Sequence, residues 1–407
     1  MRFVDELKSA VTPRAALLVI GVVALQLLFI ASYVGALHHP KPTDVAFGVA
    51  APAGAAERTM ARLDALPGDP LDTRTVRDAG QARAQIMERE IDGALVVDPT
   101  GRTDTLLVAS GGGAALSASL VKLVTEALAP QDREVRTEDV APASPEDFEG
   151  LSSFYLVVGW CVGGYLCASI LAISAGARPA NAQRAVIRLG ALALASLAGG
   201  IGGAVIIGPI LGALPGSVFA LWGLGALVTF AVGAATLALQ GLTGIVGIGL
   251  AILIVVIAGN PSAGGAFPSP MLPPFWKAIG PALPPGAGTW VARSIAYFHG
   301  NAVTGPLLVL SAWAVAGSGL TMLTAVRRKP GAAGAGATPG AGSPDSGGGT
   351  GAGTPDSGAG GGGGTGGGAG AGTGTGARTG GTGGTGGTGT GGGGAGAGGT
   401  GRPGSGT

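Results

Sequence analysis

Apolar residues follow two patterns along the chain. Six long stretches are almost uninterrupted and reach the roughly 20 residues that a helix needs to cross a bilayer. They cover residues 15–37, 153–175, 188–212, 217–239, 241–259 and 303–326. Between the first two lies a longer segment, 38–152, where short apolar runs alternate with polar and charged residues. The pattern predicts a polytopic α-helical membrane protein with six transmembrane helices and a separate domain between the first and the second.

Residues 38–152 show the alternation typical of a small α/β domain. Strand-like runs occur at 45–50, 71–76, 93–97, 103–110 and 134–140. Helical spacing separates these runs at 55–66, 80–90 and 114–128. Strands that alternate with helices favour a mixed or parallel sheet. The triplet Gly111-Gly112-Gly113 precedes the last helix but lacks the spacing of a phosphate-binding loop, so it is interpreted as a turn.

Composition supports a membrane protein with an unusual C-terminal end. Only 12% of the residues are charged, whereas soluble domains have roughly 25%, and 46% are apolar. Many of the 81 glycines lie in a Gly/Thr/Ala tract after residue 330, which predicts a disordered tail at 327–407. We interpret the tail as a tolerated repeat expansion, with a tether as the alternative. The net charge of +1 gives no basic surface for nucleic acid.

The basic residues predict the orientation in the membrane. They precede the first span, fill the loop after the second and follow the sixth: Arg2, Lys8 and Arg14, then Arg178, Arg184 and Arg188, then Arg327, Arg328 and Lys329. With six spans these clusters share one side, which the positive-inside rule makes cytoplasmic. We therefore expect a multi-pass protein of the cell membrane with both termini in the cytoplasm and 38–152 as an extracytoplasmic domain.

The cytoplasmic surface is predicted to contain two basic elements. Residues 1–14 have Phe3, Val4 and Leu7 on one helical face, which is typical of an amphipathic helix on the membrane surface. Arg178, Arg184 and Arg188 follow in the loop after the second span. This loop is a candidate docking site for a partner subunit. The alternative is that both elements only fix the topology.

A proline- and aromatic-rich outer loop at 260–302 separates the fifth and sixth spans. Prolines break spanning helices and aromatic residues favour the headgroup region, so two short interfacial helices are expected at 274–279 and 288–297. Their candidate functional residues are Trp276, Lys277, Trp290 and Arg293. Lys277 and Arg293 are expected to extend toward lipid phosphates. The loop is either a lid over a transport path or a structural re-entrant cap.

The spans lack the residue types that catalysis or metal binding requires. No Asp or Glu occurs between Glu149 and Asp345, and the chain has no P-loop motif. We therefore predict no catalytic residue, no cofactor, no metal site and no enzymatic activity. Cys161 and Cys167 lie on different faces of one helix and are not expected to form a disulfide. Closely spaced glycines in the spans indicate tight packing within the chain or a homodimer interface.

Three segments resemble a known family. They are ARAQIMEREIDGALVV at 82–97, FYLVVGWCVGGYL at 154–166, and the segment 259–300 with its Asn-Pro-Ser, Leu-Pro-Pro and Pro-Pro-Gly pattern. Together with the order of one span, an outer domain and five spans, these residues resemble the permeases of type-2 ABC exporters, especially the actinobacterial YhgE/Pip-like membrane proteins. The resemblance implies a dimerising permease for a hydrophobic or amphiphilic compound, driven by a separate ATPase subunit. The alternative is a membrane receptor or scaffold that acts through its extracytoplasmic domain.

Overall fold

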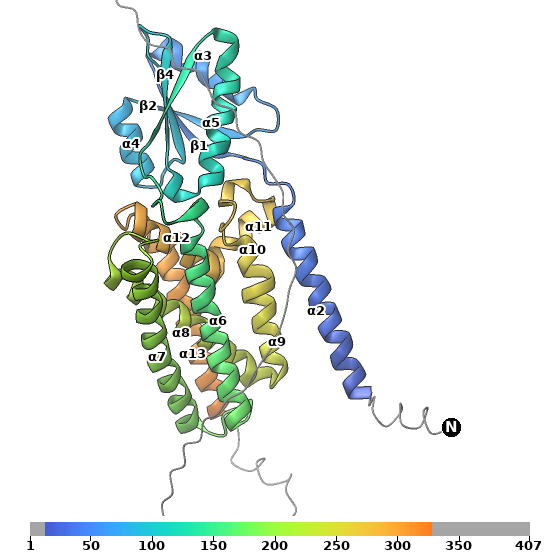
Figure 1. Cartoon of the computed structure of the whole chain (residues 1–407). Coiled ribbons are helices and arrows are strands. Elements are labelled where there is room, and N and C mark those ends of the chain that lie inside the picture. The colour runs from blue at the N-terminus through green and yellow to red at the C-terminus, as the bar shows by residue number, and fades with distance from the viewer. Residues whose placement is uncertain (1–12, 328–407) are drawn as a thin grey trace, which may run out of the picture. The chain divides into compact units, whose positions relative to one another are not determined.

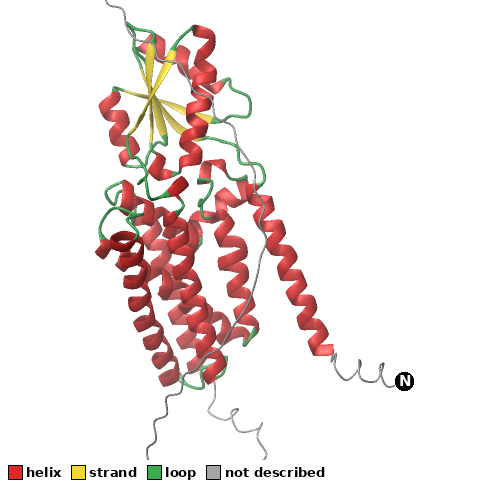
Figure 2. Cartoon of the chain, viewed as in Figure 1, coloured by secondary structure: helices red, strands yellow, loops and turns green. Residues whose placement is uncertain are grey.

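The computed structural model describes residues 13–327. The expected amphipathic helix at 1–14, except its last two residues, and almost all of the expected tail at 327–407 lie outside the described residues. The described part contains one sheet domain and a set of long apolar helices (Figure 1, Figure 2). The prediction of a polytopic helical protein with a small α/β domain after its first long helix agrees with this arrangement.

The sheet domain has five strands in the order β2-β1-β3-β4-β5. Their bounds are β1 (Val45–Ala50), β2 (Leu71–Val76), β3 (Gly93–Val96), β4 (Thr103–Val108) and β5 (Glu134–Asp139). All neighbouring pairs are parallel except β3 and β4, which run antiparallel. The antiparallel pair follows from the chain itself, because only a short turn separates β3 from β4. The five predicted strands and the mixed sheet are confirmed.

Helices cover both faces of the sheet. α3 (Ala53–Asp64) and α5 (Ala114–Leu128) enclose a core with the inward side chains of the strands, of which Phe47, Leu106 and Leu120 are fully buried. α4 (Ala79–Met87) covers the other face. This second core continues into Tyr297 and Phe298, which follow the sheet domain much later in the chain. The sheet domain therefore shares buried apolar surface with the predicted outer loop, residues 260–302.

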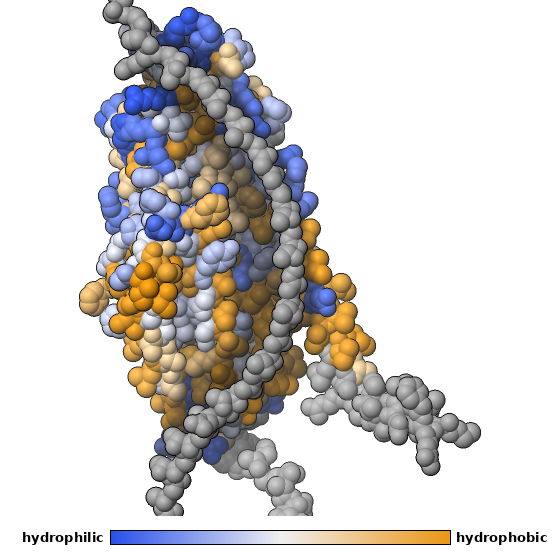
Figure 3. All heavy atoms as spheres, viewed as in Figure 1, coloured by the Kyte–Doolittle hydropathy of each residue, from blue (hydrophilic) through white to orange (hydrophobic). Residues whose placement is uncertain are grey.

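Five helices in the described range are long and apolar enough to cross a membrane. They are α2 (Pro13–Leu37), α6 (Ser152–Ala175), α7 (Ala182–Val205) with its π-helical extension η4 (Ile206–Ile210), α8 (Val218–Thr243) and α13 (Thr304–Val326). The extension contains Pro209, a residue type that kinks or ends helices, and the helical run ends at Ile210. Large apolar side chains point outward from these helices, and Figure 3 shows apolar residues over much of the visible helical surface. This surface is suited to lipid rather than water.

The span predicted at 241–259 corresponds to a shorter helical run. Gly244, with a φ of 71°, ends α8 and reverses the chain. The run then consists of α9 (Val246–Ile252), the π-helical η5 (Leu253–Gly259) and α10 (Asn260–Ser262), which together make 17 residues. At 1.5 Å per residue it is about 25 Å long, slightly less than the roughly 30 Å of a bilayer core.

Glycines allow α6, α7 and α8 to approach closely. Trp160 of α6 lies against Gly203 of α7 and Gly225 of α8, and its indole Nε1 donates to the carbonyl O of Gly199 at 3.2 Å. A Cβ atom on Gly164 would lie 2.5 Å from the carbonyl O of Thr229. The expectation that the glycines pack helices within the chain is confirmed at Gly203. A homodimer interface remains a prediction.

The predicted outer loop, residues 260–302, forms a layer of short helices and is called the proline-rich segment below. After α10 its elements are η6 (Ser269–Met271), α11 (Pro274–Ile279), η7 (Gly280–Ala282) and α12 (Pro284–Tyr297). Both predicted helices are present, but the second begins four residues earlier than expected. Pro284 and Pro285 start it because proline fits the first turn of a helix, where the missing N–H has no partner in any case.

Candidate functional site

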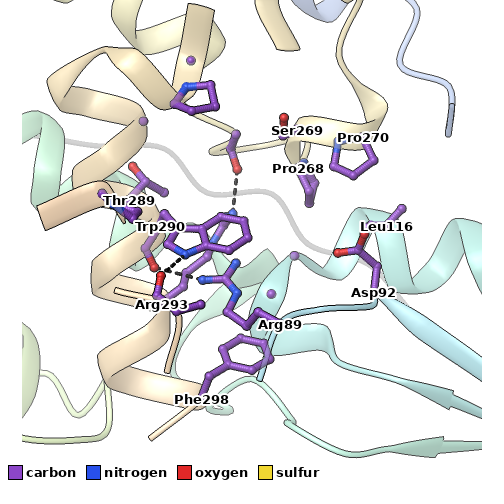
Figure 4. Close-up of a pocket in the computed structure, with 18 of the residues that line it drawn as sticks. Arg89, Asp92, Leu116, Pro268, Ser269, Pro270, Thr289, Trp290, Arg293 and Phe298 are labelled. Carbon is purple, nitrogen blue, oxygen red and sulfur yellow. Dashed lines mark hydrogen bonds between the residues drawn. The ribbon is translucent and has the colours of Figure 1, made fainter. Parts of the chain in front are cut away.

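A cavity of about 460 Å³ lies between the sheet domain and the proline-rich segment (Figure 4). Its lining residues come from the end of α4, the loop before β3, the start of α5, the proline-rich segment and the start of α13. Within the described range, α6, α7 and α8 contribute nothing to this lining. The size suits a small ligand or the headgroup end of a larger one.

Arg89 joins the two walls of the cavity. It follows α4 in a left-handed conformation, with a φ of 60°, which turns its side chain toward α12. The guanidinium lies 3.4 Å from the ring centre of Trp290 and 4.7 Å from that of Phe298. Its Nη1 donates to the carbonyl O of Trp290 at 3.0 Å and to the Oγ of Ser294 at 2.8 Å. These cation–π contacts and hydrogen bonds fix the sheet domain to α12.

Arg293, one turn beyond Thr289 on α12, is buried and also lines the cavity. Its two terminal nitrogens donate to the carbonyl oxygens of Gly264 at 2.7 Å, Gly265 at 2.7 Å and Gly150 at 3.2 Å. The side chain therefore holds the proline-rich segment against the chain leading into α6. The expectation that Arg293 extends toward lipid phosphates is wrong, because the side chain is buried and both terminal nitrogens donate to these carbonyl groups.

Burial lowers the pKa of both arginines. The pKa of Arg89 falls to about 9, chiefly through desolvation and further through the positive charge of Arg293. The pKa of Arg293 falls to about 10, again through desolvation, while the charges of Asp147 and Tyr297 oppose the shift. Both values lie well above 7, so the cavity wall carries two positive charges at neutral pH.

Asp92 is the acidic residue of the cavity wall. It lies in the loop between α4 and β3, and its backbone N–H donates to the carbonyl O of Ala46 at 2.8 Å. Its carboxylate makes no hydrogen bond to any described residue and faces the cavity (Figure 4). Burial raises the pKa of this carboxyl, although the positive charges of Arg89, Lys277 and Arg74 oppose the effect.

The triplet Gly111-Gly112-Gly113 is where the sheet domain meets the segment below it. A Cβ atom on Gly111 would lie 2.7 Å from the Cβ of Tyr297, and one on Gly112 would lie 3.3 Å from the Phe298 ring. Gly113 has a φ of 150° and packs against Pro268. The predicted turn is confirmed, and the close packing gives a further reason for three consecutive glycines.

The four residues predicted for the outer loop fall into two groups. Trp290 and Arg293 line the cavity. The indole of Trp290 also donates to the carbonyl O of Ala302 at 2.9 Å. Trp276 and Lys277 lie on α11, where the Nζ of Lys277 donates to the carbonyl O of Thr43 at 3.1 Å and lies 3.8 Å from Asp44. Lys277 therefore contacts the chain that leads into β1, and the expectation that it extends toward lipid is wrong.

The three arginines predicted for partner docking differ in accessibility. Arg178 and Arg184 are exposed, and Arg178 donates to the carbonyl O of Leu242 at 3.0 Å. Arg188 is buried, with its Nη2 donating to the carbonyl oxygens of Ala175 and Gly176, both at 2.7 Å. It satisfies carbonyl groups at the C-terminal end of α6. This position excludes Arg188 from a docking surface as the chain is folded here.

Residues 13–327 contain no group of three or more His, Cys, Asp or Glu side chains arranged to hold a metal ion. Cys161 and Cys167 are both free thiols, as predicted.

Comparison of the chain with protein families, with curated proteins and with solved structures finds no match.

Sequence reasoning missed Arg89, Asp92 and the glycine triplet as parts of one site. Arg89 and Asp92 lie in a short charged loop that is typical of a solvated surface. Their neighbours in space, Trp290 and Ser294, are about 200 positions away in the chain. The left-handed turn at Arg89 and the packing of the sheet domain against Tyr297 and Phe298 bring these residues together, and no local pattern indicates either feature.

Proposed function

We propose that this chain is the membrane subunit of an export permease for an amphiphilic compound, which it binds at the cavity between the sheet domain and the proline-rich segment. The observation that carries the proposal is the composition of that cavity. Its walls are mostly apolar, with prolines, isoleucines and Leu116, whereas its charged groups are confined to Arg89, Asp92 and Arg293. A molecule with a hydrocarbon part and a charged headgroup matches such a lining.

The positions of the helix ends support six crossings with both termini in the cytoplasm. Arg178, after α6, and Arg327, after α13, line a common depression together with Leu242 at the end of α8. The run Val246–Ser262 begins beside Gln240 of α8 and ends at the cavity below the sheet domain. It thus connects the two ends of the helical bundle formed by α6, α7, α8 and α13. The positive-inside rule then makes the arginine end cytoplasmic and the sheet domain extracytoplasmic.

Thiol labelling in intact cells tests this topology. A cysteine at exposed Glu90, in the sheet domain, is expected to react with a membrane-impermeant reagent. A cysteine at exposed Asn181, between α6 and α7, is expected to react only after the membrane is permeabilised. The parent chain, with Cys161 and Cys167, reports background labelling. The reverse pattern would overturn the orientation and with it the assignment of a cytoplasmic docking loop.

An ATPase partner is expected at two exposed arginines, Arg178 between α6 and α7 and Arg184 in the first turn of α7. The tagged full chain, purified from its native membrane in mild detergent, should retain a stoichiometric ATPase subunit identified by mass spectrometry. The double variant Arg178→Glu and Arg184→Glu should lose that subunit, because charge reversal replaces attraction by repulsion. Arg62→Glu, a charge reversal on exposed α3 of the sheet domain, is the matched control and should retain it.

The second candidate function is a membrane receptor or scaffold acting through the sheet domain. One observation favours it. The cavity is lined by the sheet domain, the proline-rich segment and the start of α13, with no contribution from α6, α7 or α8 in the described range. A site that only receives a ligand needs nothing deeper in the bundle. Ligand binding without any copurifying ATPase would support this function and contradict the permease.

A further inference from the structure

The cavity has two charged side chains whose hydrogen-bonding capacity is not used by the fold. The carboxylate of Asp92 has no hydrogen-bond partner in the described part of the chain. Of the Arg89 guanidinium, only Nη1 donates to the protein, so the edge formed by Nε and Nη2 has no partner among residues 13–327. Trp290 and Phe298 hold the plane of that guanidinium in place. The site therefore presents one fixed donor edge and one acceptor group.

The nearby cations do not neutralise Asp92 by direct contact. Lys277 donates to the carbonyl O of Thr43 and pairs with Asp44 at 3.8 Å. The terminal nitrogens of Arg293 donate to three carbonyl groups, two in the proline-rich segment and one just before α6. A half-buried carboxylate without a contact partner is unfavourable, and a ligand that carries a hydrogen-bonding cation removes that penalty.

The edge of Arg89 formed by Nε and Nη2 instead requires an anionic hydrogen-bond acceptor. Two parallel N–H groups on a planar guanidinium match two oxygens of a phosphate, which is the geometry that arginine recognises best. The stacked rings prevent the guanidinium from rotating away, so little ordering entropy is lost when an anion binds. Figure 4 shows Arg89 and Asp92 on the sheet-domain side of the same cavity. A ligand with both charges can therefore reach both residues.

We propose that the cavity recognises a zwitterionic lipid headgroup, a phosphate ester that carries a primary ammonium. The phosphate binds the free edge of Arg89, the ammonium binds Asp92, and the first part of the hydrocarbon chain lies along the apolar wall formed by Ile91, Leu116 and Pro268. This assignment rests on the proposed function, since it names the class of amphiphile bound at the same cavity. A purely anionic headgroup would leave Asp92 unpaired, and a simple amine would leave the Arg89 edge unpaired.

Equilibrium binding of three single-chain probes to the purified full chain tests the assignment. The probes are lysophosphatidylethanolamine, which has both charges, lysophosphatidylglycerol, which has only the phosphate, and dodecylamine, which has only the ammonium. The zwitterionic probe is expected to bind at least about tenfold more tightly than either of the others, a difference of about 1.4 kcal/mol. The assay is run in a neutral maltoside detergent so that the detergent carries no competing charge.

Two variants test the two contacts. Asp92→Asn should weaken the zwitterionic probe about tenfold and leave the anionic probe unchanged or bound more tightly. Arg89→Lys keeps the positive charge but removes the two-pronged edge, so it should weaken both phosphate probes and not dodecylamine. Because Arg89 also contacts α12, the thermal stability of the Arg89→Lys variant is measured alongside its binding. Glu90→Gln, an exposed acid in the same loop, is the control and should leave all three affinities unchanged.

The outcomes separate this assignment from the proposed function. Equal affinity for the three probes, or an unchanged preference in Asp92→Asn, would overturn the zwitterionic assignment but leave an amphiphile site in place. Failure to bind any probe would overturn both. A preference for the zwitterionic probe that disappears in Asp92→Asn and persists in Glu90→Gln would support both.

Discussion

The sheet domain and the helical bundle differ in how each is packed internally. In the sheet domain large apolar side chains fill the space between strands and helices, and Phe47, Leu95 and Leu106 are fully buried. In the bundle the closest approaches are made by glycines, such as Gly164 against the backbone of α8. The solvents explain the difference. Water drives apolar side chains together, but lipid does not, so helices in a membrane associate through close backbone contact.

Truncating a large core side chain in the sheet domain should have the largest effect on stability. Phe47→Ala removes a fully buried ring from the centre of β1 and leaves a cavity beneath α5. The expected loss is about 3–5 kcal/mol in the free energy of unfolding of that domain. Hydrogen exchange of the purified full chain is the measurement. Phe148→Ala removes the same ring at a position where it is 80% exposed, and a comparable loss there would contradict the buried-core explanation.

Adding a single methyl group to a closely packed glycine of the bundle should also lower stability, but by less than the loss of Phe47. Gly164→Ala places a Cβ 2.5 Å from the carbonyl O of Thr229, where backbone atoms have no room to move. A loss of about 1–3 kcal/mol is expected. The adjacent Gly163 has open space around it, so Gly163→Ala should be neutral or stabilising by up to about 1 kcal/mol. Thermal unfolding in detergent distinguishes the two, and equal effects would show that glycine spacing does not set the packing.

The junction between the two regions should respond to pH through Asp92, with the smallest effect. Because burial raises the pKa of Asp92 above its ordinary value of 3.8, the folded chain holds this proton more tightly than the unfolded chain. The resulting stabilisation is complete below pH 3.8 and is lost as the pH rises through the raised value. Without ligand, Asp92→Asn should therefore gain stability over the parent chain as the pH rises.

Thermal unfolding of the parent chain, Asp92→Asn and Glu90→Gln across this pH range is the measurement. Glu90→Gln removes an acid from the same loop at an exposed position, so it reports the effect of net charge alone. A difference between Asp92→Asn and the parent chain that shrinks with rising pH would show that Asp92 has a partner that stabilises its charged form.

The local elements followed closely from the sequence. The strand at Val45–Ala50 and the helix at Ala114–Leu128 were predicted at their observed positions, because alternation and helical spacing are properties of neighbouring residues. The short helix Pro274–Ile279 was equally clear, since prolines fix its start. The span predicted at 241–259 is the one that the structure shortens, because Gly244 reverses the chain inside the predicted range.

The candidate site followed from the sequence only in part. Trp290 and Arg293 were identified from the aromatic and basic pattern of the proline-rich segment, but their predicted environment was lipid. The structure instead places them against Arg89 and the carbonyl groups of Gly264 and Gly265. The same limitation applies to Arg188, whose sequence context indicated an exposed loop but which is buried on α7 with its Nη2 donating to carbonyl groups at the end of α6.

The sequence by itself determined the presence of long apolar helices, the existence of the sheet domain and the order of its elements. These depend on hydropathy, periodicity and the positions of proline and glycine, all of which are local. Only the tertiary structure decided that Arg89, Asp92, Trp290 and Phe298 surround one cavity. Their contacts join residues about 200 positions apart. Such contacts arise when the sheet domain packs onto the proline-rich segment through the glycine triplet. The geometry of that packing depends on residues that are distant in sequence, so no local pattern predicts it.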